Sequence, residues 1–393
     1  MKIIYLFYEY LSEGVGGLSH IWHVSKNLQQ KGHKIIIIAP RCDTHVVNKS
    51  LDIKYVPTIN IRFFRFLSFH FLSLFFVGYY IVRHSVDIIY VREMALSLTP
   101  LFLSKIFNKP MITEVNGDLI TEYEIAGYPR LFLAAMYLVQ MIVCRESQTL
   151  ICVTEGLRDI FQNRYTIPSD RIEVVPNGTD TSCFYPLDSH ECRRRLGIDP
   201  KTKIIGFVGT FVPHQGLSYL VESSSAILEN YPEAIFLLVG DGPMRKDISD
   251  MIQSMGLVDH FIFPGAVPQE KVVFYINAMD VCVAPFTRSR NERIGLSPLK
   301  IYDYLACGKP VVASDIKGVG DLLRQNELGI AVGPEDPPSL ARAILFALDD
   351  QELAIRCLQK GPAIIKKSFT WQITAQRVAE ACSNVLRKKR KKQ

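Results

Sequence analysis

Short apolar runs alternate with helical stretches along almost the whole of this 393-residue chain, and the alternation restarts once. The interior runs are continuous in Ile and Val, which is typical of strands covered by helices on both faces of a parallel sheet. One series of runs ends at the turn Pro176-Asn177-Gly178, and a second series follows it. The pattern predicts an α/β chain with two facing, Rossmann-like, doubly wound parallel-sheet domains and a cleft between them.

We expect a first domain over residues 1–178, a second over 179–368, and a last segment, 369–393, made of an amphipathic helix and a basic tail. The expected strands of the first sheet are Lys2–Phe7, Lys34–Ala39, Asp87–Val91, Met111–Val115, Thr149–Val153 and Glu173–Val175. Those of the second sheet are Ile204–Val208, Ile235–Val239, Phe261–Phe263, Val281–Ala284, Pro310–Ala313 and Ile330–Val332. In such folds ligands bind beyond the carboxyl ends of the strands.

The net charge of +6 comes entirely from the tail Arg387–Lys392, because its six cations leave 6 − 6 = 0 for the rest of the chain. A neutral body argues against a nucleic-acid surface, whereas the tail suits either an electrostatic membrane tether or a disordered, solubilising end. The nine cysteines have no metal-binding or disulfide spacing. The first strand is too short, and too acidic at Glu9 and Glu13, to be a signal peptide. We therefore expect a cytoplasmic protein.

The segment Phe63–Val82 is nearly apolar all round and about as long as a membrane span. It is rich in aromatic residues, and Arg62 and Arg83 flank it. Three interpretations stay open: a helix lying in the headgroup zone or forming a surface for a lipid acceptor, a buried core helix, and a true span. A span inside a Rossmann-like unit would break the sheet.

Three glycine turns follow strands at the edge where a ligand would bind. They contain Gly16-Gly17, then Gly209-Thr210, then Gly240 with Gly242. Glycine lets the backbone approach a ligand without a Cβ in the way. The first turn lacks the full G-x-G-x-x-G spacing and the later acidic residue, so NAD binding is not expected.

The stretch from Asn291 to Ser314 runs from a Gly/Ser/Pro turn through a helix into an apolar strand. A helix start after such a turn offers free N–H groups and a positive dipole end to an anion. Lys300 and Asp303 lie three residues apart, on one side of that helix. They suit a nucleoside diphosphate, with the cation on the phosphates and the carboxylate on ribose hydroxyls. An ordinary helix–strand unit with a solvated Lys fits the same pattern.

In their order, the motifs of this chain resemble those of the retaining nucleotide-sugar glycosyltransferases with the GT-B fold, of the group 1 and family 4 type, which build polysaccharides and glycolipids. The motifs are Gly16-Gly17, Gly32-His33, Val175–Asp180, Phe184–Pro186, Phe207–Gly209, Val239–Pro243, Phe263–Gly265, Ala278–Asp280, Pro285-Phe286, Asp303–Ser314 and Phe369–Trp371. The resemblance covers essentially the whole chain.

This resemblance implies that a hexose moves from a nucleoside diphosphate donor with retention of configuration. The donor would lie on the second domain and the acceptor on the first, with no metal and no cofactor. The implied donor-binding residues are Gly16, Gly17, Gly209, Thr210, His214, Gly240, Gly242, Ser297, Leu299, Lys300 and Asp303.

The chain departs from the family pattern at its donor site. Of the two signature glutamates, eight residues apart, the second falls on Asp303 and the first on Gly295, with Glu292 as a candidate replacement. Thr210 and Gln215 stand where the family commonly has Arg and Lys on the diphosphate. We therefore assign the missing charge, and a catalytic role, to Lys300. His214 is either a further phosphate contact or an ordinary loop histidine.

The first domain departs as well, because Asn116 replaces a histidine that many members carry near the reacting sugar. An Asn can hydrogen-bond a hydroxyl but cannot act as acid or base, so its catalytic role would be contact with the sugar. Retaining transfer of this kind needs no strong protein base, since the leaving phosphate can take the acceptor's proton. Acceptor-side candidates are Glu122, Glu124 and the pair Arg92-Glu93.

The sequence thus favours a membrane-associated retaining glycosyltransferase that extends a lipid-linked or cell-surface glycan at the cytoplasmic face. A catalytically silent partner of another transferase is the alternative that the departures leave open. A sugar-nucleotide epimerase on a similar frame would need carboxylates and a histidine for which the sequence offers no positions.

Overall fold

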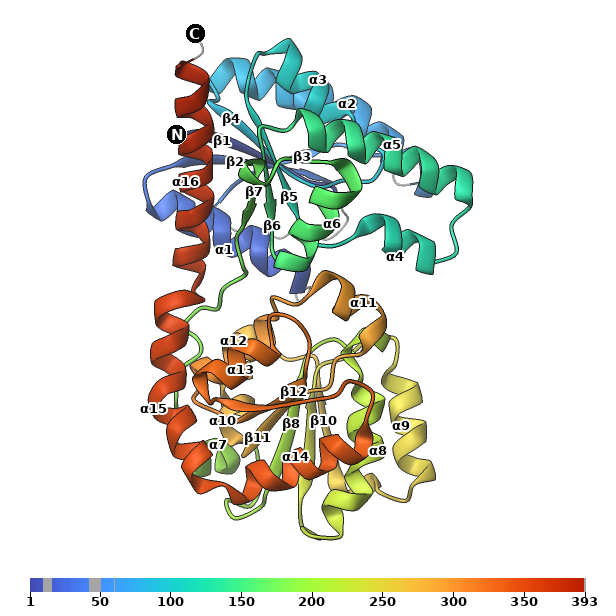
Figure 1. The fold of residues 1–393 in the computed structure, drawn as a ribbon, viewed down its shortest axis with the longest axis vertical. Helices are drawn as coiled ribbons and strands as arrows, with labels where there is room; N and C mark the ends of the chain where they lie inside the picture. The colour runs from blue at the N-terminus through green and yellow to red at the C-terminus, as the bar shows by residue number, and fades with distance from the viewer. Residues whose placement is uncertain (10–15, 42–50, 60, 392–393) are drawn as a thin grey trace. The chain divides into compact units, whose positions relative to one another are not determined.

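The computed structural model describes residues 1–9, 16–41, 51–59 and 61–391 (Figure 1). It divides into two compact units, one formed by Met1–Pro176 with Trp371–Gln393 and the other by Asn177–Thr370. We call them unit 1 and unit 2. The division thus falls after Pro176, where the sequence analysis placed it after residue 178. The expected separate segment 369–393 instead contributes a long helix to unit 1.

Unit 1 has one sheet of seven parallel strands in the order β3-β2-β1-β4-β5-β6-β7, with helices on both faces (Figure 1). The strands are β1 Lys2–Leu6, β2 Lys34–Pro40, β3 Asp52–Val56, β4 Ile88–Arg92, β5 Met111–Val115, β6 Thr149–Cys152 and β7 Ile172–Val174. The helices are α1 Gly16–Gln30, α2 Arg62–His84, α3 Thr99–Ile106, α4 Leu119–Ile125, α5 Arg130–Glu146, α6 Glu155–Tyr165, the 3₁₀ turn η1 Ser169–Arg171 and α16 Trp371–Arg390.

Unit 2 repeats the architecture with six parallel strands in the order β10-β9-β8-β11-β12-β13. The strands are β8 Ile204–Val208, β9 Ile235–Val239, β10 Phe261–Gly265, β11 Val281–Ala284, β12 Val311–Ser314 and β13 Gly329–Val332. The helices are α7 Ser189–Arg195, η2 Pro213–Gln215, α8 Leu217–Leu228, α9 Arg245–Ser254, η3 Val258–His260, α10 Gln269–Ala278, α11 Arg288–Ile294, α12 Leu299–Ala306, α13 Gly320–Asn326, α14 Pro337–Asp349 and α15 Gln351–Ser368.

The two parallel sheets confirm the predicted doubly wound fold. All twelve expected strands are present, and no end differs from the prediction by more than two residues. Strand β3, Asp52–Val56, was not among the predicted strands, and its last residue alone is buried. An edge strand of this kind lacks the continuous apolar run that identified the interior strands.

Helix α2 has two apolar faces. One packs in the core through Phe69, Val77 and Ile81, which are almost fully buried. Between Phe64 and Val82, every exposed side chain is apolar or aromatic. These side chains are Phe64, Leu67, Phe71, Phe75, Tyr79 and Val82, with 46–68% of each exposed. Their spacing of three or four residues places them on one stripe of the helix.

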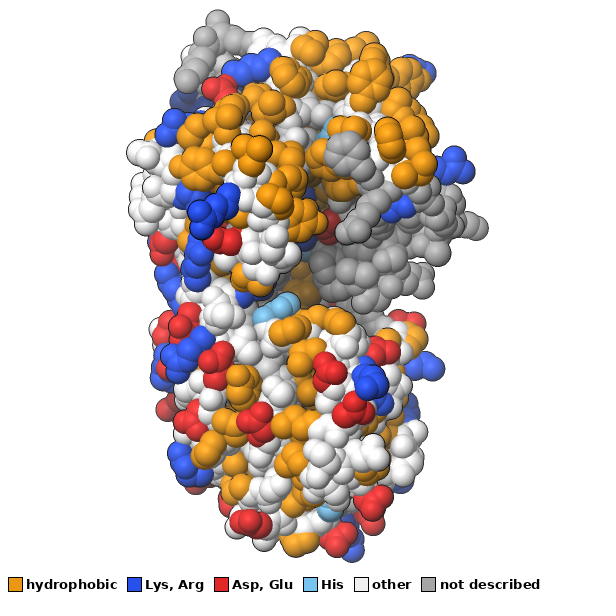
Figure 2. Space-filling view, turned by 90° about the vertical axis from the view of Figure 1, so that its right-hand side faces the viewer, with side chains coloured by type: hydrophobic (Ala, Val, Ile, Leu, Met, Phe, Trp, Pro, Cys, Tyr) orange, Lys and Arg blue, Asp and Glu red, His pale blue; other side chains and the backbone are white. Residues whose placement is uncertain are grey.

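Hydrophobic side chains gather on the face of unit 1 that Figure 2 shows. By length and composition, Phe64–His84 is the one helix among the described residues that could cross a membrane, and 28% of its most apolar window is buried. Core helices of soluble proteins reach the same length and composition. The half-buried packing corrects the interpretation of a fully buried core helix.

Helix α16 packs along α1 in unit 1. The rings of Trp371 and His23 stack at 5.1 Å with an interplanar angle of 2°. The Thr374 hydroxyl donates to the Pro176 carbonyl at 2.9 Å. The expected basic tail is helical as far as Arg390, so the interpretation of a disordered end is wrong for these residues.

Candidate functional site

In unit 2 the strand order reverses between β8 and β11, which is where ligands bind in doubly wound sheets. The turn η2 follows β8 and lies against the segment that follows β11. Gly216 ends η2 with φ +67°, and a Cβ there would lie 1.8 Å from the Pro285 carbonyl oxygen. Only glycine permits this approach, which holds the two loops together at the reversal point.

Lys300 extends from α12 into this region. Its Nζ donates to Gln215 Oε1 at 2.7 Å and lies 3.7 Å from the centre of the Phe207 ring. A Cβ on Gly209 would be 2.6 Å from the same Nζ, so glycine leaves room for the ammonium group. Desolvation lowers the pKa of Lys300 well below its ordinary value. Within the described part of the chain, this half-buried side chain forms no ion pair with a carboxylate.

The surroundings of Lys300 coincide with the places where family members commonly carry two cations. Gln215 is one of these positions, and Thr210, the other, directly follows Gly209 and is exposed. His214 is half-buried beside them, and burial, with the charges of Arg290 and Lys300, lowers its pKa to about 4. His214 is therefore neutral at physiological pH and can exchange hydrogen bonds without adding charge.

Asp303 lies one turn further along α12, where Thr179 Oγ1 donates to its Oδ1 at 2.5 Å. Desolvation raises the pKa of Asp303 to about 7, against the hydrogen bond from Thr179. Hydrogen bonds from donors such as ribose hydroxyls would stabilise the charged form of this carboxylate. Its role in donor binding remains a prediction.

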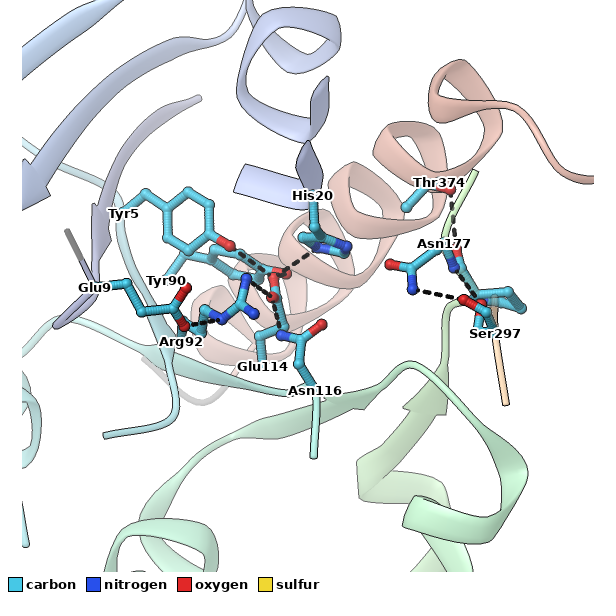
Figure 3. Close-up of polar contacts among 11 residues, drawn as sticks. Tyr5, Glu9, His20, Tyr90, Arg92, Glu114, Asn116, Asn177, Ser297 and Thr374 are labelled. Carbon is cyan, nitrogen blue, oxygen red and sulfur yellow. Dashed lines mark hydrogen bonds and ion pairs between the residues drawn. The ribbon is translucent and has the colours of Figure 1, made fainter. Parts of the chain in front are cut away.

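The turn before α12 is fixed within unit 2. Asn177 donates from its backbone N to Ser297 Oγ at 2.8 Å, and from its side chain to the Ser297 carbonyl at 2.9 Å (Figure 3). Leu299, the first residue of α12, is half-buried. These contacts hold the start of α12 in place, so that its free N–H groups have a defined direction.

Packing within unit 2 accounts for two predicted positions at the end of β9. A Cβ on Gly240 would lie 1.9 Å from the Gly209 carbonyl oxygen, and one on Gly242 would lie 2.6 Å from that of Phe211. Glycine at 240 and 242 is thus needed for the close approach of two loops, whether or not a ligand binds there. Gly16 and Gly17 begin α1, and residues 10–15 before them lie outside the described residues.

The structure gives no sign that Glu292 takes the place of the carboxylate absent at Gly295. Glu292 is exposed and accepts from Arg288 Nη1 at 3.2 Å, one turn earlier in α11. Gly295 is buried at the end of that helix, with φ +65°.

Unit 1 has a buried polar cluster where its own strand order reverses, between β1 and β4. Glu114, on β5, is fully buried and accepts from the hydroxyls of Tyr5 and Tyr90 at 2.9 and 2.5 Å (Figure 3). His20 Nε2 lies 3.0 Å from the same carboxylate. Burial alone would raise the pKa of Glu114, but His20 and Arg92 outweigh it and lower the pKa to about 2.

This cluster fixes the orientation of Asn116. The Asn116 Nδ2 donates to Glu114 Oε1. An ionised carboxylate only accepts hydrogen bonds, so the amide must point its NH₂ inward and turn its carbonyl oxygen away from Glu114. Asn116 thereby presents an acceptor, suited to a hydroxyl group. Glu114 was not among the predicted site residues, although a Glu inside the buried strand MITEV was a signal, since buried charges need partners.

The remaining acceptor-side candidates lie near this cluster or on α4. Arg92 Nε pairs with Glu9 at 2.7 Å. Glu93 accepts from Gln140, and burial raises its pKa to about 8. Glu122 and Glu124 lie on α4, half-buried and exposed respectively. In the described ranges, no three His, Cys, Asp or Glu side chains gather as a metal site.

Two family models match this chain. The model "Glycosyltransferase Family 4" matches residues 15–182, and "Glycosyl transferases group 1" matches residues 188–363. Together they extend over nearly all of both units.

Among curated proteins, an alpha-D-kanosaminyltransferase of Streptomyces kanamyceticus is 23% identical over 72% of this chain and 73% of its own length. An uncharacterized glycosyltransferase of Methanocaldococcus jannaschii is 24% identical over 94% of this chain and 95% of its own. Among solved structures, Anabaena HepE in complex with UDP and glucose has a TM-score of 0.76, 19% identity and coverage of 98% and 99%. The last likeness is one of fold.

Proposed function

We propose a retaining, metal-independent hexosyltransferase activity for this chain, which belongs to the glycosyltransferases that combine a family 4 domain with a group 1 domain. Its donor would be a nucleoside diphosphate sugar, and its acceptor a lipid-linked or cell-surface glycan at the cytoplasmic face of a membrane. The observation that carries the donor proposal is the Lys300 ammonium, which lies against Gln215 and Gly209 with an uncharged hydrogen-bond partner.

The diphosphate would lie at the start of α12, with Lys300 on its oxygens and neutral His214 beside it. Anionic groups gain from helix N–H groups and from a desolvated cation, which stabilise charge that develops in the transition state. Asp303 would accept from the ribose hydroxyls. A uridine diphosphate sugar is the first donor to test, because the structural relative HepE is in complex with UDP and glucose.

In the proposed transfer, the bond between the anomeric carbon and the diphosphate oxygen breaks as the acceptor oxygen bonds the same face of that carbon. The acceptor's proton passes to the departing phosphate, so that charge and atoms balance without a protein base. Asn116 would accept a hydrogen bond from a sugar hydroxyl through its carbonyl oxygen. Lys300 would neutralise the diphosphate as it leaves.

The membrane part of the proposal depends on the exposed stripe of α2. Contiguous apolar area of this kind marks an interaction surface on a soluble domain. Phe102 and Ile106 extend it on α3, with 52% and 69% exposed. The basic end of α16 lies close by, since Lys389 Nζ is 3.0 Å from Oδ1 of Asn108, just beyond α3. Apolar stripes with neighbouring cations are typical of helices that lie in the headgroup region.

The test begins with thermal shifts of the purified full chain against UDP, GDP, ADP and their sugar conjugates. A ligand that binds the folded state raises the melting temperature. The nucleotide that gives the shift then enters a transfer assay with lipid-linked acceptors, and NMR of the product gives the anomeric configuration. An inverted product would overturn the retaining mechanism.

The silent-partner alternative predicts a different result. It is favoured by Gly295, Thr210 and Gln215, which leave the donor site with fewer charged contacts. Absence of any nucleotide shift would support it and would contradict the assignment of Lys300.

A further inference from the structure

A pocket of about 350 Å³ opens at the edge of unit 1 where the first strands of the sheet begin. The walls come from the starts of β1, β2 and β3, the end of α1 and the end of α2. Its lining residues are Lys2, Gln29, His33, Lys34, Ile35, Ile36, Asp52, Arg83 and His84. This edge is the opposite one from the carboxyl ends of the strands, so the pocket is separate from the Glu114 cluster.

The charge of this pocket is positive. Lys2, Lys34 and Arg83 contribute cations, and among the described residues of the lining Asp52 alone is acidic. Asp52 is already paired, since Lys54 Nζ lies 2.7 Å from its Oδ1. The floor is formed by Ile35 and Ile36, with 7% and 6% exposed. Cations around a small apolar floor suit an organic anion, in which a phosphate is joined to a short carbon chain.

The pocket lies at the carboxyl end of α2, the helix that carries the apolar stripe. The stripe ends at Val82, which is 68% exposed, and the next two residues, Arg83 and His84, line the pocket. A bilayer has the same order of groups, with acyl chains beside phosphates. The charge pattern therefore selects one occupant among those that an apolar helix face could have: a phospholipid with an anionic headgroup.

We propose that this pocket binds the headgroup of an anionic phospholipid, while the stripe of α2 lies among the acyl chains of the same leaflet. The proposal rests on the membrane association stated above. It adds that binding depends on a specific pocket and not on diffuse positive charge alone. Lys34 and Arg83 would contact the phosphate, and His33 and Gln29 would contact the polar part of the headgroup.

The test uses flotation of the full chain with vesicles of phosphatidylcholine alone or mixed with phosphatidylglycerol. The pocket variant is Lys34→Glu with Arg83→Glu, and the control is Lys246→Glu with Lys271→Glu, two exposed lysines of unit 2. Both carry the same change in net charge. We expect the pocket variant to lose about tenfold or more of its affinity for the mixed vesicles, and the control to lose much less.

Folding of the pocket variant is verified by its melting temperature and by the donor-induced shift, which unit 2 should retain. A milder variant, Lys34→Gln with Arg83→Gln, should show a smaller loss in the same direction. Equal losses for pocket and control variants would overturn the pocket and leave diffuse attraction as the cause. If the native chain bound no vesicle, the pocket and the proposed membrane association would both fall, while donor binding would stand.

A soluble anion is the other source of the same chemistry. Inorganic phosphate and glycerol phosphate are therefore added to the flotation assay and to thermal shifts without vesicles. We expect neither compound to displace the chain from mixed vesicles, because the stripe of α2 contributes to lipid binding and not to binding of a free anion. Displacement by either compound, with a melting shift that the pocket variant lacks, would overturn the lipid assignment.

Discussion

Replacement of Lys300 by methionine should separate binding of the diphosphate from binding of the nucleoside. The amino group of Lys300 is desolvated and donates a hydrogen bond to an uncharged partner, Gln215. A charge pair about 4 Å apart at an effective dielectric constant of about 20 gains about 4 kcal/mol. Loss of one electrostatic donor at an active site costs a similar amount, about 3–4 kcal/mol. We therefore expect Lys300→Met to lower turnover by a factor of about 10²–10³.

The assay compares the affinity for a nucleoside diphosphate with that for the bare nucleoside, by calorimetry on the native and variant proteins. Lys300→Met should strongly weaken the affinity for the nucleoside diphosphate and leave the affinity for the nucleoside unchanged. Lys309→Met is a matched control, because Lys309 follows the same helix and donates to the Asn277 carbonyl at 2.7 Å. It should lower the melting temperature and leave the affinity ratio intact. Native affinity of Lys300→Met for the diphosphate would refute the assignment of the charge to Lys300.

Three further predictions concern titration and the buried cluster. Because the pKa of Asp303 is raised to about 7, donor affinity should fall by about tenfold per pH unit below that value, and Asp303→Asn should abolish this pH dependence. The stability of the free protein should fall as the pH rises from about 4 to 7, since the folded state binds the extra proton. The pKa of Glu114 is lowered, so its contribution of about 3 kcal/mol to the free energy of unfolding should be present above pH 4.5 and be lost toward pH 2. Acid unfolding of the Glu114→Gln variant should lack this pH-dependent loss. Asn116→Ala should lower turnover by about threefold to tenfold without altering nucleotide affinity, because one hydrogen bond to a sugar hydroxyl is lost. A matching fall in nucleotide affinity, measured by calorimetry, would contradict that role.

The sequence predicted the strand series and the position of α12 because both depend on local patterns. It could not show that Lys300 reaches Gln215, which is 85 residues away in the chain. That contact depends on how α12 lies at the carboxyl end of β8, where Val208 N donates to the Tyr304 hydroxyl. The proposal that Lys300 replaces absent cations therefore came from a resemblance, and the contact adds its physical basis.

Other features were missed for different reasons. The buried cluster around Glu114 draws its members from β1, α1, β4 and β5, so no spacing in the sequence identifies it. The amphipathic pattern of α16 showed that one face is buried but not against which partner. Because α16 packs on α1, the residues from Trp371 onward belong to unit 1.

The return of α16 to unit 1 has a consequence for the order of folding during synthesis. Unit 2 is one continuous stretch, Asn177–Thr370, and can fold as soon as it leaves the ribosome. Unit 1 needs α16, which is made after all of unit 2. Until then the face of α1 with His23 lacks its Trp371 partner. A nascent chain stopped before Trp371 should thus hold a complete second unit and an unfinished first, with the surface under α16 open to chaperones.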